Sequence, residues 1–547
     1  MHMMMQGQAT VGPPRCGSMG TPFGALPIPS PRLPGSVRRS VWVANTPSQT
    51  ASKACRWKLA AVKSSQTLET ADTDLIQLIS DISKDVDSRH AGLLRDAKGA
   101  TPDIEGLDSS LRGKAQTAIL SLQSGLLERE TEVRLLLLAA LCGEHLLLLG
   151  PPGTAKSELS RRLAELTGGR YFERLLTRFS VPEELFGPLS MKGLENDLYE
   201  RQTSGYLPTA EVAFIDEVFK ANSAILNALL TILNERLFSN GSARLEVPLL
   251  CLVGASNELP ESEELDALYD RFLLRRQVAQ VSSAQLGNLA RLAAGSLRAT
   301  TQTSADGAEA GGGRLELADF HGTASTAYSA VEVPDSVIDL LTTTRDYLQD
   351  KCEPPIYVSD RRFMKAIKML QVAAHVDGRS AVHEYDCLLL EFVLGSRPDD
   401  SQKVRAFVLE TIASDPGLQQ LELVFLGLFG RACRALEGGN EQDVAEAQQE
   451  ASQLVELLDL RQGSVGLTLD GGFADLGATI WQSEGSVREA VQVLTPPMTE
   501  NRKKAEDLLR EALLLQTALQ RQVAASALER ILPKRYKQYQ KGVSGRV

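Results

Sequence analysis

Eight consecutive residues in the first third of the chain have the types and order that phosphate binding needs. The apolar run Leu146–Leu149 predicts a buried strand before them, and a helical pattern follows them. A loop between a strand and a helix N-terminus presents unpaired backbone N–H groups to phosphate oxygens. We therefore predict a phosphate loop that consists of Gly150, Pro151, Pro152, Gly153, Thr154, Ala155, Lys156 and Ser157.

Two side chains of this loop have separate roles in the prediction. Lys156 supplies a mobile positive charge for the β- and γ-phosphates of ATP, and the Ser157 hydroxyl is a ligand for Mg²⁺. Ala155 departs from the general motif, which has glycine before the lysine. We expect its methyl group to be tolerated because the residue has helical φ.

A second apolar run, Val212–Ile215, ends in two acidic residues, Asp216 and Glu217. A carboxylate at the C-terminal end of a buried parallel strand lies beside the phosphate loop. We therefore expect Asp216 to hold Mg²⁺ through water. We expect Glu217 to orient and polarise the attacking water.

Three further residues complete the predicted catalytic set. Asn257 follows a third apolar strand and is placed to position the hydrolytic water, the role called sensor 1. Arg271 follows a short helix and reaches a neighbour's nucleotide more easily than its own, a contribution worth about 10³–10⁵ in rate; the alternative is an arginine paired with Asp270. Arg361 is the sensor-2 candidate on the γ-phosphate, with Arg362 as the second choice and a solvated arginine as the alternative.

Composition narrows the possible partners. The chain has 547 residues and a net charge of −11, from 58 Lys and Arg against 69 Asp and Glu. Nucleic-acid-binding domains are usually basic, so we expect no nucleic-acid partner. No apolar run reaches the roughly 18 residues of a membrane span, so we expect no stable membrane insertion. The seven cysteines contain no CxxC pair, which argues against a zinc module or a disulfide scaffold.

The first 68 residues differ from the rest of the chain. They contain eight Lys and Arg but no Asp or Glu. Acid-poor N-termini with arginine and serine are typical of organelle transit peptides. The proline-rich composition favours the chloroplast stroma, with the mitochondrion as the alternative; an ordinary tail is the other interpretation.

Together these motifs resemble those of the MoxR family of AAA+ ATPases, and most of all its RavA subfamily (regulatory ATPase variant A). The resemblance is dense over about 111–394. Besides the phosphate loop, it is carried by Glu173–Ser190, Tyr199–Ala221, Ile225–Gly241 and Ser359–Gln371. It implies an α/β AAA+ P-loop core, in which helices flank a parallel sheet, an all-α lid and a mostly helical C-terminal region.

The resemblance also divides the chain and implies partners. We predict a linker with a weak helix at 69–105, an α/β ATPase domain at 106–299, a flexible insertion at 300–330, a lid at 331–399 and a helical region at 400–547. The resemblance implies a hexameric ring, with an insert near Asn196–Leu207 and a hairpin near Leu237–Pro248 that faces the pore. A von Willebrand A partner would be a separate chain, because its DxSxS motif is absent here. A small client-binding module is expected near Gly463–Ser483, which has a less helical pattern.

The resulting hypothesis is a Mg²⁺-dependent ATP hydrolase that remodels protein complexes. One alternative is a motor subunit like that of magnesium chelatase, and another is a nucleotide-gated scaffold with little turnover. The intact set of predicted catalytic residues favours hydrolysis over the scaffold. The acidic charge disfavours a nucleic-acid helicase.

Overall fold

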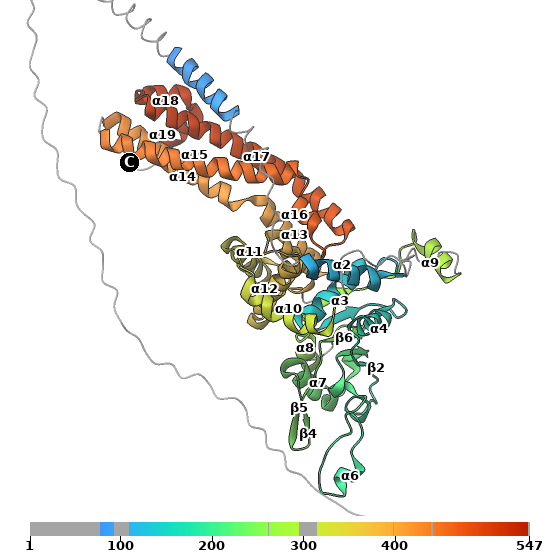
Figure 1. Cartoon of the computed structure of the whole chain (residues 1–547). Helices are drawn as coiled ribbons and strands as arrows, with labels where there is room; N and C mark the ends of the chain where they lie inside the picture. Colours follow the sequence, from blue (N-terminus) through green and yellow to red (C-terminus); the bar gives the residue numbers. More distant parts are fainter. Residues whose placement is uncertain are drawn as a thin grey trace, which may run out of the picture. The chain divides into compact units, whose positions relative to one another are not determined.

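Figure 1 shows the chain as a computed structural model, which describes residues 77–91, 109–260, 262–294, 314–395, 397, 399–438 and 441–544. The predicted transit peptide at 1–68 lies outside the described residues. Within the described residues, no helix is both long and apolar enough to cross a membrane.

A five-stranded parallel sheet forms the centre of the α/β domain. Its strand order is β2 (Tyr171–Leu175), β3 (Val212–Asp216), β6 (Cys251–Ser256), β1 (Leu146–Leu149) and β7 (Leu274–Gln277). The central strand β1 consists of four leucines and is buried throughout. This arrangement confirms the predicted fold class and brings the ends of β1, β3 and β6 to the same edge.

Alternate side chains of β1 pack into two separate apolar cores. Leu146 and Leu148 pack with helices on one face, and Leu147 and Leu149 pack with helices on the other, as the two-residue period of a strand requires. The first core includes α3 (Glu130–Cys142) and α4 (Lys156–Thr167), and the second includes α7 (Ser223–Glu235) and α8 (Glu263–Tyr269). The sheet is therefore covered by helices on both faces.

Two excursions leave the α/β domain at the same end (Figure 1). One contains α5 (Glu183–Phe186) and α6 (Met191–Leu194), and the other is the hairpin of β4 (Leu237–Asn240) and β5 (Ala243–Glu246). They are joined where the backbone N–H of Arg201 donates to the Asn240 side chain at 2.6 Å. The predicted hairpin is thus present, and its position in a pore stays a prediction.

The lid is helical, and one predicted boundary is wrong. Helix α10 (Leu317–Ala330) lies within the segment predicted to be a flexible insertion, and it packs against α3 and α12 (Asp360–Val376). The helix forms because Phe320 and Ala327 are buried in the core between these helices.

The remaining elements before and within the lid are α2 (Ser109–Gln123), α9 (Leu286–Ala293), α11 (Asp335–Asp346), η4 (Tyr347–Lys351) and η5 (Glu384–Phe392), together with the short turns η2 (Leu207–Thr209) and η3 (Val218–Lys220).

Long helices make up the C-terminal region, as predicted. They are α13 (Asp400–Ser414), α14 (Pro416–Gly438), α15 (Glu441–Asp470), α16 (Ala474–Ala478), α17 (Glu484–Gln520), α18 (Ala525–Ile531) and α19 (Pro533–Ser544). The expectation of a less helical segment from Gly463 is wrong as far as Asp470, because α15 continues to that residue.

The predicted linker at 69–105 contains a packed helix at 77–91. Ile82 and Val86 are fully buried in the same apolar core as α14, α15 and α17. Asp87 forms an ion pair with Arg510 of α17 at 2.9 Å. This part of the chain is therefore a component of the C-terminal helical region, and the linker prediction is wrong for it.

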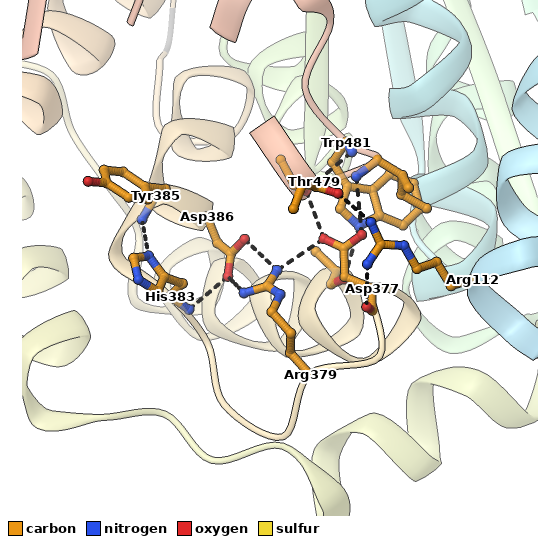
Figure 2. Close-up of polar contacts among 11 residues, drawn as sticks. Arg112, Asp377, Arg379, His383, Tyr385, Asp386, Thr479 and Trp481 are labelled. Carbon is orange, nitrogen blue, oxygen red and sulfur yellow. Dashed lines mark hydrogen bonds and ion pairs between the residues drawn. The ribbon is translucent and has the colours of Figure 1, made fainter. Parts of the chain in front are cut away.

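A buried carboxylate joins the lid to the C-terminal region (Figure 2). Asp377, which is 4% exposed, accepts hydrogen bonds from the Thr479 hydroxyl at 2.7 Å and the Ile480 N–H at 3.1 Å, and it pairs with Arg379 at 3.1 Å. The indole N–H of Trp481 donates to the Ala373 carbonyl of α12 at 2.9 Å. Burial raises the pKa of Asp377, and these donors offset the cost of burying its charge.

Two arginines of the α/β domain contact the same C-terminal segment. Arg112 on α2 donates to the carbonyl oxygens of Ala478 at 2.5 Å and Asp377 at 3.3 Å. Arg134 on α3 donates to the Ile480 carbonyl at 2.9 Å. The segment 478–481 thus contacts both the α/β domain and the lid.

Substitution Asp377→Ala should lower the free energy of unfolding by about 3 kcal/mol, because it leaves the donors of Thr479 and Ile480 without their acceptor and removes one of the two carboxylates that pair with Arg379, the other being Asp386. Chemical denaturation would measure the loss. Asp475→Ala, which removes a side chain that is 59% exposed, is the matched control. Equal losses in the two variants would contradict a special role of Asp377.

Candidate nucleotide site

The predicted phosphate loop follows β1 and lies against its two neighbouring strands. The N–H of Gly150 donates to the Ser256 carbonyl of β6 at 2.9 Å. Gly150 has φ of +150°, and a Cβ atom there would lie 2.2 Å from the carbonyl oxygen of Val278. A larger residue would therefore push the loop away from the sheet.

The reason given for tolerating alanine before the lysine is wrong. Ala155 has φ of +66° and ψ of +23°, which is left-handed rather than helical backbone. Glycine adopts this conformation without steric cost, whereas alanine loses about 1–2 kcal/mol there. The general motif's glycine therefore suits this position, and the loop holds Ala155 in a conformation of higher energy.

The N-terminus of α4 is open for an anion. No side chain caps it, so its first backbone N–H groups have no acceptor from the capping residue Ala155. Lys156 is 7% exposed, and its Nζ donates to the carbonyl oxygens of Gly150 at 2.6 Å and Pro151 at 3.0 Å. Burial lowers the pKa of Lys156, an effect that Asp216 and Glu217 oppose. The positive charge of Lys156 thus interacts with the carboxylates of both Asp216 and Glu217.

The predicted water-activating residues lie together at the carboxyl edge of the sheet. Asn257 Nδ2 donates to Glu217 Oε1 at 3.0 Å, and Lys220 Nζ is 3.2 Å from Glu217 Oε2. Asp216 Oδ1 accepts the N–H of Glu217 at 3.0 Å. Glu217 therefore has a fixed orientation, and it lines a pocket of about 380 Å³ that Ser256 also lines.

The residues fit Mg²⁺ held mostly by phosphate and water. Ser157 is the second residue of α4, and Asp216 ends β3. Among the described residues there is no group of three or more His, Cys, Asp or Glu side chains that could enclose a metal ion. Mg²⁺ commonly takes one or two protein oxygens and completes its shell with substrate phosphates and water.

The two predicted arginines lie at the other edge of the sheet. Arg271 precedes β7, whose Leu274 pairs with Leu146 at the start of β1, whereas the phosphate loop follows the end of β1. Arg271 Nη1 is 3.5 Å from Asp270 Oδ2, the pairing that was the alternative interpretation. Its position is consistent with action on a neighbouring subunit, and it does not lie beside its own loop.

Arg361 lies close to Arg271. Its Nη2 donates to Asn234 Oδ1, near the end of α7, at 2.5 Å. Burial, and next the charge of Arg361, lower the pKa of Arg271. Since α7 runs back from Glu217 to the amino edge, Arg361 is not beside the phosphate loop of its own chain. Contact with the γ-phosphate of its own nucleotide is therefore not made in this conformation.

One residue that holds the phosphate loop in place was not predicted from the sequence. Arg129, which is 5% exposed, donates to the carbonyl oxygens of Thr154 at 3.1 Å and Ala279 at 2.8 Å. It lies 25 positions before Thr154, outside any motif spacing, so the sequence offered no signal for it.

Substitution Ala155→Val should weaken ATP binding, because a β-branched side chain adopts left-handed φ at a higher cost than alanine. Ala155→Gly, the matched variant that fits this backbone, should bind ATP as tightly as the wild type or more tightly. Titration with a fluorescent ATP analogue would measure both affinities. Equal affinity in the valine variant would contradict the left-handed loop.

Comparison with known proteins identifies the family. Residues 113–311 match a family described as the MoxR domain in the MoxR–vWA–β-propeller ternary systems, and residues 336–408 match the AAA lid domain. An uncharacterised protein of Methanocaldococcus jannaschii is 43% identical over 52% of this chain and 72% of its own length. Protein MoxR of Paracoccus denitrificans is 27% identical over 45% of this chain and 70% of its own.

A solved structure from Cytophaga hutchinsonii covers 55% of this chain and 94% of its own, with 17% identity and a TM-score of 0.43. The family matches and the curated relatives agree with the loop, sheet and lid described above. The chain belongs to the MoxR family of AAA+ ATPases.

Proposed function

We propose that this protein is a Mg²⁺-dependent ATP hydrolase that works as a ring and remodels protein complexes. The observation that carries the proposal is the contact of Asn257 with Glu217 beside the buried Lys156. These groups have the chemistry to bind a triphosphate and to direct a water at its last phosphate. Membership of the AAA+ family supports the same reaction.

The reaction assigns a role to each group. The loop amides and Lys156 bind the β- and γ-phosphates, and Ser157 and Asp216 hold the metal. Mg²⁺ supplies charge neutralisation on the phosphate oxygens. Glu217, oriented by Asn257, positions the water and accepts its proton as the γ-phosphorus–oxygen bond to ADP breaks.

A site completed by a neighbour accounts for the arginines. Arg271 and Arg362 both pair with Asp270 at the amino edge of the sheet, and the charge of Arg361 lies close enough to lower the pKa of Arg271. Like charges so close repel each other. A neighbouring subunit's triphosphate would relieve this repulsion, and Arg271 and Arg361 would stabilise the transferred phosphoryl group. The hexameric number is part of the proposal.

A partner protein would couple this motor to its client. The matched MoxR domain is named for systems that also contain a von Willebrand A protein and a β-propeller, which supports a von Willebrand A partner in a separate chain. The contacts of segment 478–481 with the lid and the α/β domain offer a route for lid motion to reach the C-terminal helices. The RavA subfamily, the client module and the chloroplast location stay predictions.

Substitution Glu217→Gln should lower the ATPase rate at least about 100-fold, because the amide cannot accept the proton of the attacking water. ATP affinity should stay near that of the wild type. Glu258→Gln, in the same pocket, is the matched control and should retain activity. A phosphate-release assay would measure both rates. Undiminished hydrolysis in Glu217→Gln would show that Glu217 does not activate the water. Separately, removal of Mg²⁺ should stop hydrolysis in the wild type.

Mixing two inactive variants tests the composite site. Arg271→Ala should bind ATP but lose about 10³-fold or more in rate. When mixed with Glu217→Gln, it should regain activity, because some sites then combine an intact Glu217 with an intact Arg271. Arg291→Ala, which removes an exposed arginine on α9, is the control for loss of surface charge. Activity of the mixture no greater than the sum of its parts would contradict the shared site.

A further inference from the structure

The first two turns of the lid helix α12 are fastened to the amino edge of the sheet by three polar contacts. Arg361 bonds Asn234, Arg362 bonds Asp270, and Lys365 bonds Glu144. The three lid residues lie in the matched lid domain, and their partners lie in the matched MoxR domain. A rotation of the lid relative to the sheet must therefore lengthen or break these contacts.

One of these contacts is shared with the arginine proposed to act in trans. Asp270 Oδ1 accepts from Nη2 of Arg362, whose side chain is 6% exposed, while Asp270 Oδ2 lies 3.5 Å from Nη1 of Arg271. Charge-assisted hydrogen bonds are normally about 2.7–2.9 Å long. Asp270 thus binds the lid arginine closely and the trans arginine only loosely.

The loose contact matters because Arg271 must leave Asp270 to bind a phosphate. Arg271 Nε is buried and makes no hydrogen bond among the described residues. A carboxylate that has lost one arginine attracts the other more strongly, because its charge is no longer shared. Removal of Arg362 would therefore draw Arg271 onto Asp270 and away from a neighbour's nucleotide.

We propose that Asp270 is a positioning residue for which Arg362 of the lid and Arg271 of the α/β domain compete. When the lid keeps Arg362 on Asp270, Arg271 is free to serve the next site. When the lid turns away, Asp270 captures Arg271, and the next site loses its arginine. This inference rests on the proposed function, and it makes the lid of one subunit a regulator of hydrolysis in its neighbour.

The test is a pair of substitutions with opposite effects. Arg362→Gln should lower kcat about tenfold, the scale of one charge-assisted hydrogen bond, with the affinity for ATP unchanged. Adding Asp270→Asn to this variant should restore kcat to within about threefold of the wild type, because the amide no longer captures Arg271. A double variant as slow as Arg362→Gln, or slower, would overturn the competition.

Two further variants separate this effect from damage to the fold. Arg362→Lys keeps a charge beside Asp270 and should stay close to the wild-type kcat, even if its melting temperature falls. Lys365→Gln removes another contact between lid and sheet, with Glu144, and any loss of kcat it causes should not be restored by Asp270→Asn. Restoration of both Arg362→Gln and Lys365→Gln would overturn the inference, since Asp270 would then act on lid packing in general.

The mixing of Arg271→Ala with Glu217→Gln distinguishes a failure of the inference about Asp270 from a failure of the proposed function. If that mixture regains activity while Asp270→Asn fails to restore Arg362→Gln, the inference is wrong and the proposed function stands. If the mixture stays inactive, the shared site and the inference fall together. If the mixture regains activity and Asp270→Asn restores Arg362→Gln, then adding Arg362→Gln to Arg271→Ala should cause no further loss of kcat.

Discussion

Parallel pairing of β1 with β6 and β7 is the constraint on which the candidate site depends. It fixes the phosphate loop at the carboxyl ends of the strands, with Asp216, Glu217 and Asn257 beside it. The same pairing fixes Arg271 at the opposite, amino ends. Groups needed for one reaction are thereby held at two edges of one rigid sheet. This separation is the physical reason to infer that each site takes residues from two subunits.

Charge is distributed unequally between these edges. At the carboxyl edge, the acids Asp216 and Glu217 oppose the effect of burial on Lys156. At the amino edge, Asp270 pairs with both Arg271 and Arg362, and the charge of Arg361 lowers the pKa of Arg271. The excess positive charge is costly in an isolated subunit and favourable beside a triphosphate. In the proposed ring, the same electrostatic property would link assembly, catalysis and the position of the lid.

Motifs whose chemistry depends on neighbouring positions could be predicted from the sequence. The structure has a strand at the four leucines of β1, a loop after them, and Asp216 and Glu217 at the end of β3, as predicted. The hairpin after α7 was implied by the family resemblance. The left-handed conformation of Ala155 was missed, although the glycine that the general motif has at this position is a signal for positive φ. The contact of Arg129 with the loop, by contrast, depends on tertiary structure.

Long-range packing also explains the misjudged helices. Residues 77–91 and α10 have weak patterns by themselves and are stabilised by apolar side chains from distant segments. Helix α17 contains Pro496 and Pro497, residues that ordinarily predict a helix end. Its neighbours α13, α14 and α15 pack along it, and burial of apolar side chains between them stabilises the helix despite the two prolines.

The most direct measurement of the central claim is the ATPase rate per subunit as a function of protein concentration, with Mg²⁺ present. A site completed by a neighbour's arginine requires assembly before hydrolysis. With such shared sites, the rate per subunit should rise with concentration and reach a plateau as rings form. A measurable rate that stays constant down to concentrations at which light scattering detects only monomers would contradict it.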